Sequence, residues 1–214
     1  MPLAPFLSLD GIDGTGKSTQ CRLLAEWLSA NGVANRLCAD PGGTALGDQL
    51  RSILLTSRTT MSPRAEALIF MASRAELVSE IIRPALESGQ VVICDRFVTA
   101  NVVYQGHAGG LSPLDLWAVG GFCTDHLFPD RTFILDLPVE VAAKRRGRTA
   151  DRMESRGPDY LDRVRRGFLA EAAKQPDRYV VIDASPDVTT LQSELRRHVT
   201  EYLSARGIAI AGSP

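Results

Sequence analysis

A glycine-rich segment near the start of the chain has the residue types and spacing of a phosphate-binding loop. Residues 11–19 read GIDGTGKST, so that Gly11 is followed, after four residues, by Gly16-Lys17-Ser18. Glycines let successive backbone N–H groups curl around a phosphate, and a helix starting near Lys17 adds the positive end of its dipole. Lys17 can place a charge on the outer phosphates, and the Ser18 hydroxyl can ligate Mg²⁺. The segment predicts a nucleotide-phosphate site made of Gly11, Ile12, Asp13, Gly14, Thr15, Gly16, Lys17, Ser18 and Thr19.

Further charged residues follow later apolar runs. Asp40-Pro41-Gly42-Gly43, Asp95-Arg96 and Asp183 each come where a strand-like run ends. Because the carboxyl ends of parallel strands lie along one edge of a sheet, we expect these residues to converge on the glycine-rich loop. Asp95 could reach Mg²⁺ directly or through water, and Arg96 could clamp a phosphate with a bidentate fork. The alternative for Asp95 and Arg96 is a surface ion pair at a strand end.

Apolar runs alternate with helical patterns along the whole chain, which predicts a parallel sheet with helices on both faces. Expected strands cover residues 6–9, 33–38, 90–94, 132–137 and 179–182. Expected helices cover 17–30, 45 to about 55, 63–86, 98–104, 113–123, 139–146, 160–174 and 188–205, and Pro84 would bend the third of these near its end. The predicted fold is a three-layer α/β sandwich of the P-loop class, with a five-stranded parallel sheet and a short lid.

Composition excludes several classes of function. The 214 residues suit one domain spanning 1–214, and the net charge of −1 speaks against a polymeric nucleic acid as partner. No segment reads as a membrane span or a secretory leader. The four cysteines form no C-x-x-C pair, which favours reduced thiols and a cytoplasmic location over disulfides or zinc.

The order of the motifs resembles that of bacterial thymidylate kinases over nearly the whole chain. After the P-loop come Asp40-Pro41-Gly42-Gly43-Thr44, Phe70 and Arg74, Asp95-Arg96-Phe97, Tyr104-Gln105-Gly106, Asp151-Arg152-Met153-Glu154 and residues 181–185. The resemblance implies a P-loop kinase that phosphorylates dTMP to dTDP, with ATP as donor and Mg²⁺ as cofactor. It also implies a homodimer.

The resemblance assigns roles to residues on the acceptor side. Asp13 would face the acceptor, although an Asx turn is the alternative. Phe70 and Arg74 lie four apart on one helix face. The ring would stack on thymine and the guanidinium would reach the carbonyl edge of the base; the alternative is that Phe70 is core and Arg74 is solvated. Asn101 would hydrogen-bond the base, and Tyr104 would crowd the 2′ position of the sugar, with Gln105 beside it.

The resemblance also places the catalytic arginine. One family type carries it in the P-loop, where this chain has Gly14, so this chain resembles the type with the arginine in the lid, here residues 147–157. The candidates are Arg148, then Arg152, then Arg146, and the alternative for this charge run is a solvated face. Many members also have an arginine where this chain has Ala39, a charge that Arg51 could supply instead.

Two rival functions stay open at this point. One is a P-loop kinase for another nucleotide or for a deoxynucleoside. The other is a catalytically weak, nucleotide-binding regulatory protein, which the Ala39 departure leaves open.

Overall fold

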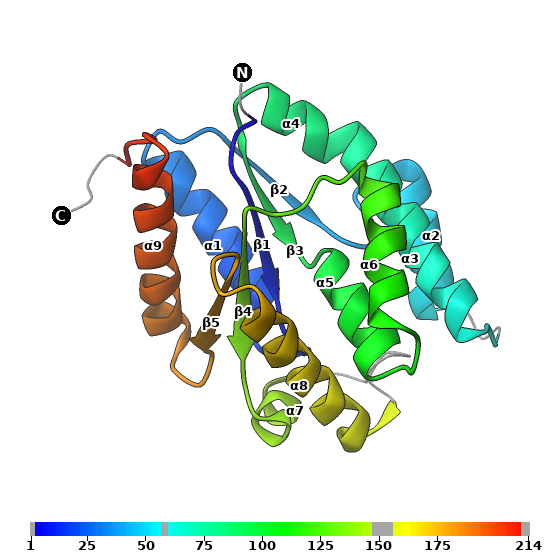
Figure 1. Ribbon diagram of the computed structural model, residues 1–214. Coiled ribbons are helices and arrows are strands. Elements are labelled where there is room, and N and C mark those ends of the chain that lie inside the picture. Colours follow the sequence, from blue (N-terminus) through cyan, green and yellow to red (C-terminus); the bar gives the residue numbers. More distant parts are fainter. Residues whose placement is uncertain (1–2, 57–59, 147–155, 211–214) are drawn as a thin grey trace.

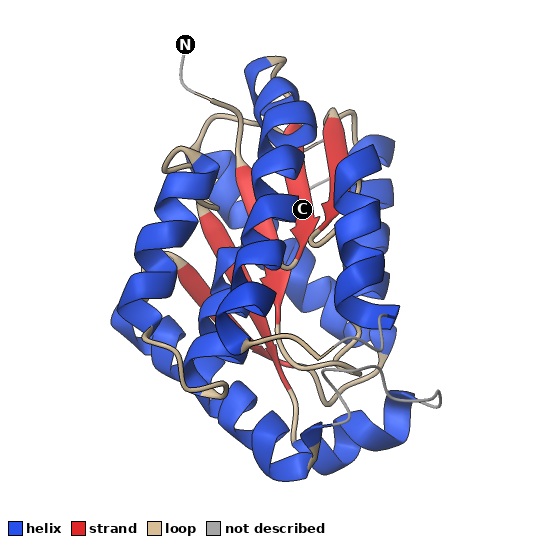
Figure 2. Ribbon diagram, turned by 90° about the vertical axis from the view of Figure 1, so that its right-hand side faces the viewer, coloured by secondary structure: helices blue, strands red, loops and turns tan. Residues whose placement is uncertain are grey.

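The computed structural model describes residues 3–56, 60–146 and 156–210, with the side chain of residue 146 outside the description. A five-stranded, all-parallel sheet forms its centre, in the order β2-β3-β1-β4-β5 (Figure 1). The strands are β1 (Phe6–Asp10), β2 (Asn35–Ala39), β3 (Val91–Asp95), β4 (Arg131–Asp136) and β5 (Tyr179–Asp183). Helices cover both faces of this sheet (Figure 2), which confirms the predicted three-layer α/β architecture.

Most helices lie within a few residues of the predicted ranges. They are α1 (Lys17–Ala30), α2 (Ala45–Thr56), α3 (Pro63–Leu77), α4 (Arg83–Glu87), α5 (Val98–Asn101), α6 (Pro113–Thr124), α7 (Val139–Arg146), α8 (Pro158–Lys174) and α9 (Val188–Ala205). Two π-helical segments, η1 (Val78–Ile82) and η2 (Val102–His107), continue α3 and α5. No helix in the described ranges is long and apolar enough to cross a bilayer.

The helix predicted for residues 63–86 is continuous, but one turn before Pro84 is π-helical rather than α-helical. Its α-helical part ends at Leu77, and the wider π-helical turn η1 separates it from α4. Proline lacks a backbone N–H and its ring meets the carbonyl four residues earlier, so a widened turn before Pro84 accommodates it. The chain keeps helical backbone angles from α3 through η1 into α4, so α3, which carries several pocket residues, belongs to one long helical segment.

Strand β2 begins two residues later than predicted. The N–H of Val33 donates to the carbonyl of Leu28 (2.9 Å), so Val33 belongs to the capped end of α1 rather than to the strand. Such capping satisfies carbonyls at a helix end that would otherwise lack a partner. Strand β2 then pairs with β3 from Asn35↔Val91 to Ala39↔Asp95, which brings Asp40 alongside the end of β3.

The core lies on both sides of β1 and β3. Leu7 and Leu9 belong to a cluster with buried residues of α1, α8 and α9, whereas Phe6 belongs to a cluster with α3, η1 and α6. Val91, Val92, Ile93 and Cys94 are all fully buried, as expected for a central parallel strand. With both faces packed, the carboxyl edge of the sheet is the place where the loops are open to ligands.

Candidate functional site

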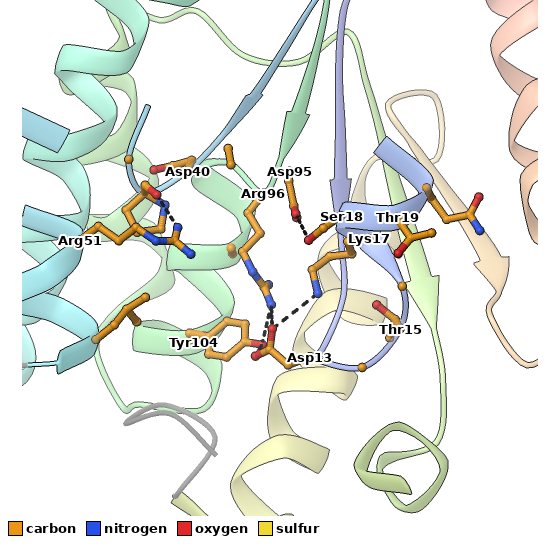
Figure 3. A pocket seen from close by; sticks show the side chains of 18 of the residues that line it. Asp13, Thr15, Lys17, Ser18, Thr19, Asp40, Arg51, Asp95, Arg96 and Tyr104 are labelled. Carbon is orange, nitrogen blue, oxygen red and sulfur yellow. Dashed lines mark hydrogen bonds and ion pairs between the residues drawn. The ribbon is translucent and has the colours of Figure 1, made fainter. Parts of the chain in front are cut away.

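A cavity of about 960 Å³ opens at the carboxyl edge of the sheet. It is lined by the loop after β1, by the loop after β2 and by residues from α2, α3 and η2. The predicted convergence of the P-loop, Asp40 and Asp95-Arg96 is therefore confirmed, and Figure 3 shows these side chains around one space.

The glycines of the first loop hold conformations that other residues rarely adopt. Gly14 and Gly16 both have φ of 94°. Gly11 has φ of 138°, and a Cβ there would lie 2.5 Å from the carbonyl oxygen of Leu135. Gly16 caps α1 without any side-chain hydrogen bond to the first turn. The loop and the helix start thus offer backbone N–H groups to an anion, as the spacing predicts.

Lys17 is more buried than the sequence suggests for a residue that contacts phosphate. It is only 5% exposed, and its Nζ donates to the carbonyl of Ile12 (2.9 Å) and lies 3.7 Å from Asp13 Oδ1. Burial, and next the nearby charge of Arg96, lower the pKa of this ammonium. The ammonium of Lys17 is therefore held under the loop rather than out in solvent, and it still lies at the wall of the cavity.

Asp13, Arg96 and Tyr104 form a triangle across the cavity floor. Arg96 Nη2 donates to Asp13 Oδ1 (2.6 Å) and to Tyr104 Oη (3.3 Å), and Tyr104 Oη donates to Asp13 Oδ2 (3.3 Å) (Figure 3). The guanidinium also lies 5.1 Å from the centre of the Tyr104 ring. Burial alone would raise the pKa of Asp13, but Arg96 and Lys17 outweigh it and the pKa is lowered. Asp13 is thus a carboxylate with Oδ1 held toward Arg96 and Lys17 and Oδ2 held by Tyr104, rather than the cap of an Asx turn.

Arg96 owes its position to an unusual backbone. It has φ of 71°, in the left-handed region that few non-glycine residues occupy. Its N–H donates to the carbonyl of Leu9 and its Nη1 to the carbonyl of Gly11, both at 2.9 Å. Strand β1, the glycine-rich loop and the end of β3 therefore hold this one guanidinium over the cavity.

Ser18 and Asp95 are directly paired. The Ser18 hydroxyl donates to Asp95 Oδ2. A hydroxyl and a carboxylate oxygen are hard ligands that suit Mg²⁺, a cation that keeps several waters and takes its remaining ligands from phosphates. No cluster of three or more histidine, cysteine or acidic side chains within residues 3–56, 60–146 and 156–210 could hold a metal by itself. The donor set fits a Mg²⁺ that arrives with a nucleotide.

The far end of the cavity is formed by Phe70, Arg74 and their neighbours. Both side chains line the cavity, and Phe70 is half-buried. Arg74 is 2% exposed, with its Nε donating to Asp40 Oδ2 (2.5 Å) and its Nη1 to Asn101 Oδ1 (3.2 Å). The alternative of a solvated Arg74 is excluded. This guanidinium is fixed at a buried wall, where a bound base would meet N–H donors.

Asp40, the partner of Arg74, has a raised pKa. Burial raises the pKa of this carboxyl group, and the positive charge of Arg74 offsets only part of the rise. The neighbouring Arg51 lines the cavity from α2 and its Nη1 donates to the carbonyl of Pro41 (2.5 Å). Arg51 is therefore the cation beside the loop that follows Ala39, as the sequence suggests.

One predicted member of the site lies elsewhere. Asp183 does not line the cavity; its Oδ1 accepts from the N–H of Ser185 (2.9 Å). The reason is the strand order: β5 is at the edge of the sheet, two positions from β1. With neighbouring strands about 4.8 Å apart, its end falls about 10 Å from the glycine-rich loop.

Sequence reasoning missed several residues near the cavity. Arg145 lines it and donates to the carbonyls of Ala184 and Ser185, both at 2.6 Å. Glu66, 2% exposed, accepts from Gln105 and from Arg156. Spacing could have pointed to Glu66, which lies one turn before Phe70 on the same face of α3. The lid candidates Arg148 and Arg152 lie outside the described residues, as does the side chain of Arg146.

Comparison with known proteins gives a consistent result. A family model described as thymidylate kinase matches residues 9–195. A thymidylate kinase of Symbiobacterium thermophilum is 47% identical, and the match covers 95% of this chain and 96% of that protein. One of Desulfovibrio desulfuricans is 42% identical, over 94% of this chain and 98% of its own length. The solved structure of a thymidylate kinase from Ehrlichia chaffeensis is similar with a TM-score of 0.75 at 33% identity, covering 92% of this chain and 99% of that one.

Proposed function

This chain belongs to the thymidylate kinase family, and we infer that it phosphorylates dTMP to dTDP with ATP as the donor. The observation that carries the inference is the single cavity in which the glycine-rich loop faces Phe70 and Arg74 across the Asp13–Arg96–Tyr104 triangle. A phosphate-holding loop at one end of the cavity, and an aromatic ring beside a fixed guanidinium at the other, suit a reaction between two nucleotides. Neither rival, a kinase for another acceptor or a regulatory binder, is favoured.

The donor nucleotide occupies the glycine-rich loop, with its phosphates on the N–H groups of residues 11–19 and on Lys17. Ser18 and Asp95 would hold Mg²⁺, which would neutralise charge on the phosphates. Lys17 Nζ is already fixed by the carbonyl of Ile12, so its charge is in place before the phosphates arrive. Phosphoryl transfer needs such alignment and positive charge more than covalent help from the protein.

The acceptor occupies the opposite end. Arg96 binds the phosphate of dTMP, for which its fork geometry is suited. Phe70 stacks on the base, and Arg74 and Asn101 face its polar edge. Tyr104 stands against the sugar, held there by Asp13 and Arg96. Gln105 supports Asn101 from behind (2.7 Å).

The active form is a homodimer in the cytoplasm. Five large apolar side chains are exposed on three helices that pack together, α2, α3 and α6: Leu46, Ile53, Leu68, Leu114 and Phe122. Phe122 is 84% and Leu114 79% exposed, more than a solvated surface favours. Light scattering should give the mass of a dimer, and Phe122→Asp should give a monomer. A wild-type monomer at micromolar concentration would overturn the dimer.

The cytoplasmic assignment is supported by four free thiols.

The decisive experiment is a coupled ADP-release assay with ATP, Mg²⁺ and each nucleoside monophosphate in turn. We expect dTMP to be the best acceptor and dUMP, which lacks one methyl group, to be poorer by the ~1–3 kcal/mol such a group is worth. We expect dCMP to be rejected more strongly, because its amino group would meet the donors of Arg74. Another monophosphate turning over faster than dTMP would support the first rival, and tight ATP binding without turnover the second.

A further inference from the structure

A buried chain of hydrogen bonds runs from Arg156 to Arg74, behind the base end of the cavity. Arg156 Nη2 donates to both oxygens of Glu66, at 2.9 and 2.7 Å. Gln105 Nε2 donates to Glu66 Oε1 (2.9 Å), Asn101 Nδ2 to Gln105 Oε1 (2.7 Å), and Arg74 Nη1 to Asn101 Oδ1 (3.2 Å). The four residues from Glu66 to Arg74 are each 2% exposed, so water cannot readily replace a lost partner.

The two ends of this chain are fixed cations. Arg74 is held by Asp40 through its Nε. Arg156 is held by the Tyr160 hydroxyl, which accepts from its Nη1 (3.1 Å), and its guanidinium lies 5.1 Å from the centre of that ring. Tyr160 in turn donates to the carbonyl of Tyr104 in η2 (2.7 Å). An arginine can only donate, so the chain has a donor at each end.

A chain with donors at both ends needs one member that accepts from both sides. Each side-chain amide donates through its nitrogen and accepts through its oxygen. Gln105 and Asn101 therefore each accept on one side and donate on the other, so the donor-to-acceptor direction, the polarity of the chain, stays the same through both. Only the carboxylate of Glu66 accepts from both directions. It sets the orientation of both amides and directs the oxygen of Asn101 to Arg74.

We propose that Glu66 and Arg156 are positioning residues for base selectivity, because Glu66 fixes the polarity of the amides that hold Arg74. This rests on the proposed function, in which Arg74 and Asn101 face the base. With the polarity as observed, Asn101 accepts from Arg74 and keeps the guanidinium at the wall of the cavity. With the polarity reversed, the Asn101 amino group would meet the guanidinium, donor against donor.

The test is Glu66→Leu, which removes the acceptor at the end of the chain with a side chain of similar size. Gln105 Nε2 then loses its acceptor, so nothing fixes the orientation of the two amides and the Asn101 amino group can turn toward Arg74. We expect the ratio of kcat/KM for dTMP to that for dCMP to fall by about 5- to 150-fold, equivalent to the ~1–3 kcal/mol of an unpaired buried donor. The KM for dTMP should rise more than kcat falls, since no reacting atom is touched.

A second substitution distinguishes polarity from the mere loss of an ion pair. Gln105 and Arg156 both donate to Oε1 of Glu66. In Glu66→Gln, an amide oxygen at that place has two lone pairs and can still accept from both, although the negative charge is gone. Glu66→Gln should therefore keep most of the wild-type ratio. If the ion pair itself matters, Glu66→Gln will instead lower the ratio as much as Glu66→Leu.

The matched control is Glu171→Leu in α8. Glu171 is 1% exposed and accepts from His107 of η2 (2.7 Å), Trp117 (3.1 Å) and Lys174 (2.6 Å), and neither it nor those partners line the cavity. It should leave the dTMP-to-dCMP ratio unchanged. The inference is overturned if Glu66→Leu keeps the wild-type ratio, if Glu66→Gln lowers the ratio as much as Glu66→Leu, or if Glu171→Leu lowers it equally. A wild-type enzyme that accepts dCMP as well as dTMP would instead overturn the proposed base reading.

Discussion

Asp10 gives a prediction about how stability depends on pH. It ends β1, is 0% exposed, and neither carboxylate oxygen has a hydrogen-bond partner among the described residues. Burial raises its pKa from 3.8 to about 7, although Arg96 and Lys17 oppose the shift. Between these two pH values the native state keeps a proton that the unfolded chain has released. The free energy of unfolding therefore falls as pH rises from about 4 to about 7.

The magnitude follows from the shift. A difference of about 3 pKa units at roughly 1.4 kcal/mol each gives about 4 kcal/mol over the whole window, and about 2–3 kcal/mol between about pH 5 and about pH 7. Asp10→Asn removes the titration and leaves a side chain of the same shape. The free energy of unfolding of the variant relative to wild type should rise by that amount from about pH 5 to about pH 7, and then level off.

Urea unfolding across this pH range measures the difference directly. The control is Asp187→Asn, because Asp187 caps α9 at an exposed position and the backbone N–H of Thr190 lowers its pKa. Because this pKa is lowered, the ionised Asp187 contributes to the stability of the folded state at every pH above its unfolded pKa of 3.8, and this contribution is lost only as pH falls below that value. Because asparagine is itself a good helix N-cap, that variant should differ from wild type only by a small constant over this pH range. A constant difference for Asp10→Asn as well would refute the reasoning.

Three further predictions concern catalysis. Lys17→Ala should lower kcat by roughly 10²–10³-fold, since it removes a fixed donor from the phosphates; near-normal turnover by a folded variant would contradict the assignment. Tyr104→Ala should raise the kcat/KM of ribonucleotides relative to deoxynucleotides, and an unchanged ratio would place the sugar discrimination elsewhere. Alanine at one of Arg148, Arg152 and Arg146, in that order of expectation, should lower kcat by roughly 10³–10⁵-fold with a smaller change in ATP affinity. Three variants with most of the wild-type rate would exclude a lid arginine.

Local rules account for the parts of the site that could be predicted from sequence. The glycine-rich loop is specified by its own residues, since Gly11 and Gly16 need backbone angles that a side chain would strain. The approach of Asp95 and Arg96 to that loop follows from parallel strand order alone. The same rule gave a wrong placement for Asp183, because it does not say which strand lies at the edge of the sheet.

Long-range pairing accounts for the parts that could not be predicted. Glu66 and Arg156 are 90 positions apart, and their contact depends on how α3 packs near the start of α8. No periodicity within either segment encodes that contact. The burial of Lys17 was missed for a related reason: its ammonium turns back to the carbonyl of Ile12, a choice that depends on loop geometry and not on residue type.

The side chain of Arg96, which its left-handed backbone aims over the cavity, affects the free energy of ligand binding. The side chain is ordered by Gly11, Asp13 and Tyr104 before any ligand arrives. Immobilising a flexible side chain on binding costs about 0.5–1.5 kcal/mol, a factor of roughly 2–10 in affinity. Here that entropy is lost during folding, so an arriving phosphate meets a preorganised guanidinium and has only to compete with Asp13 for it.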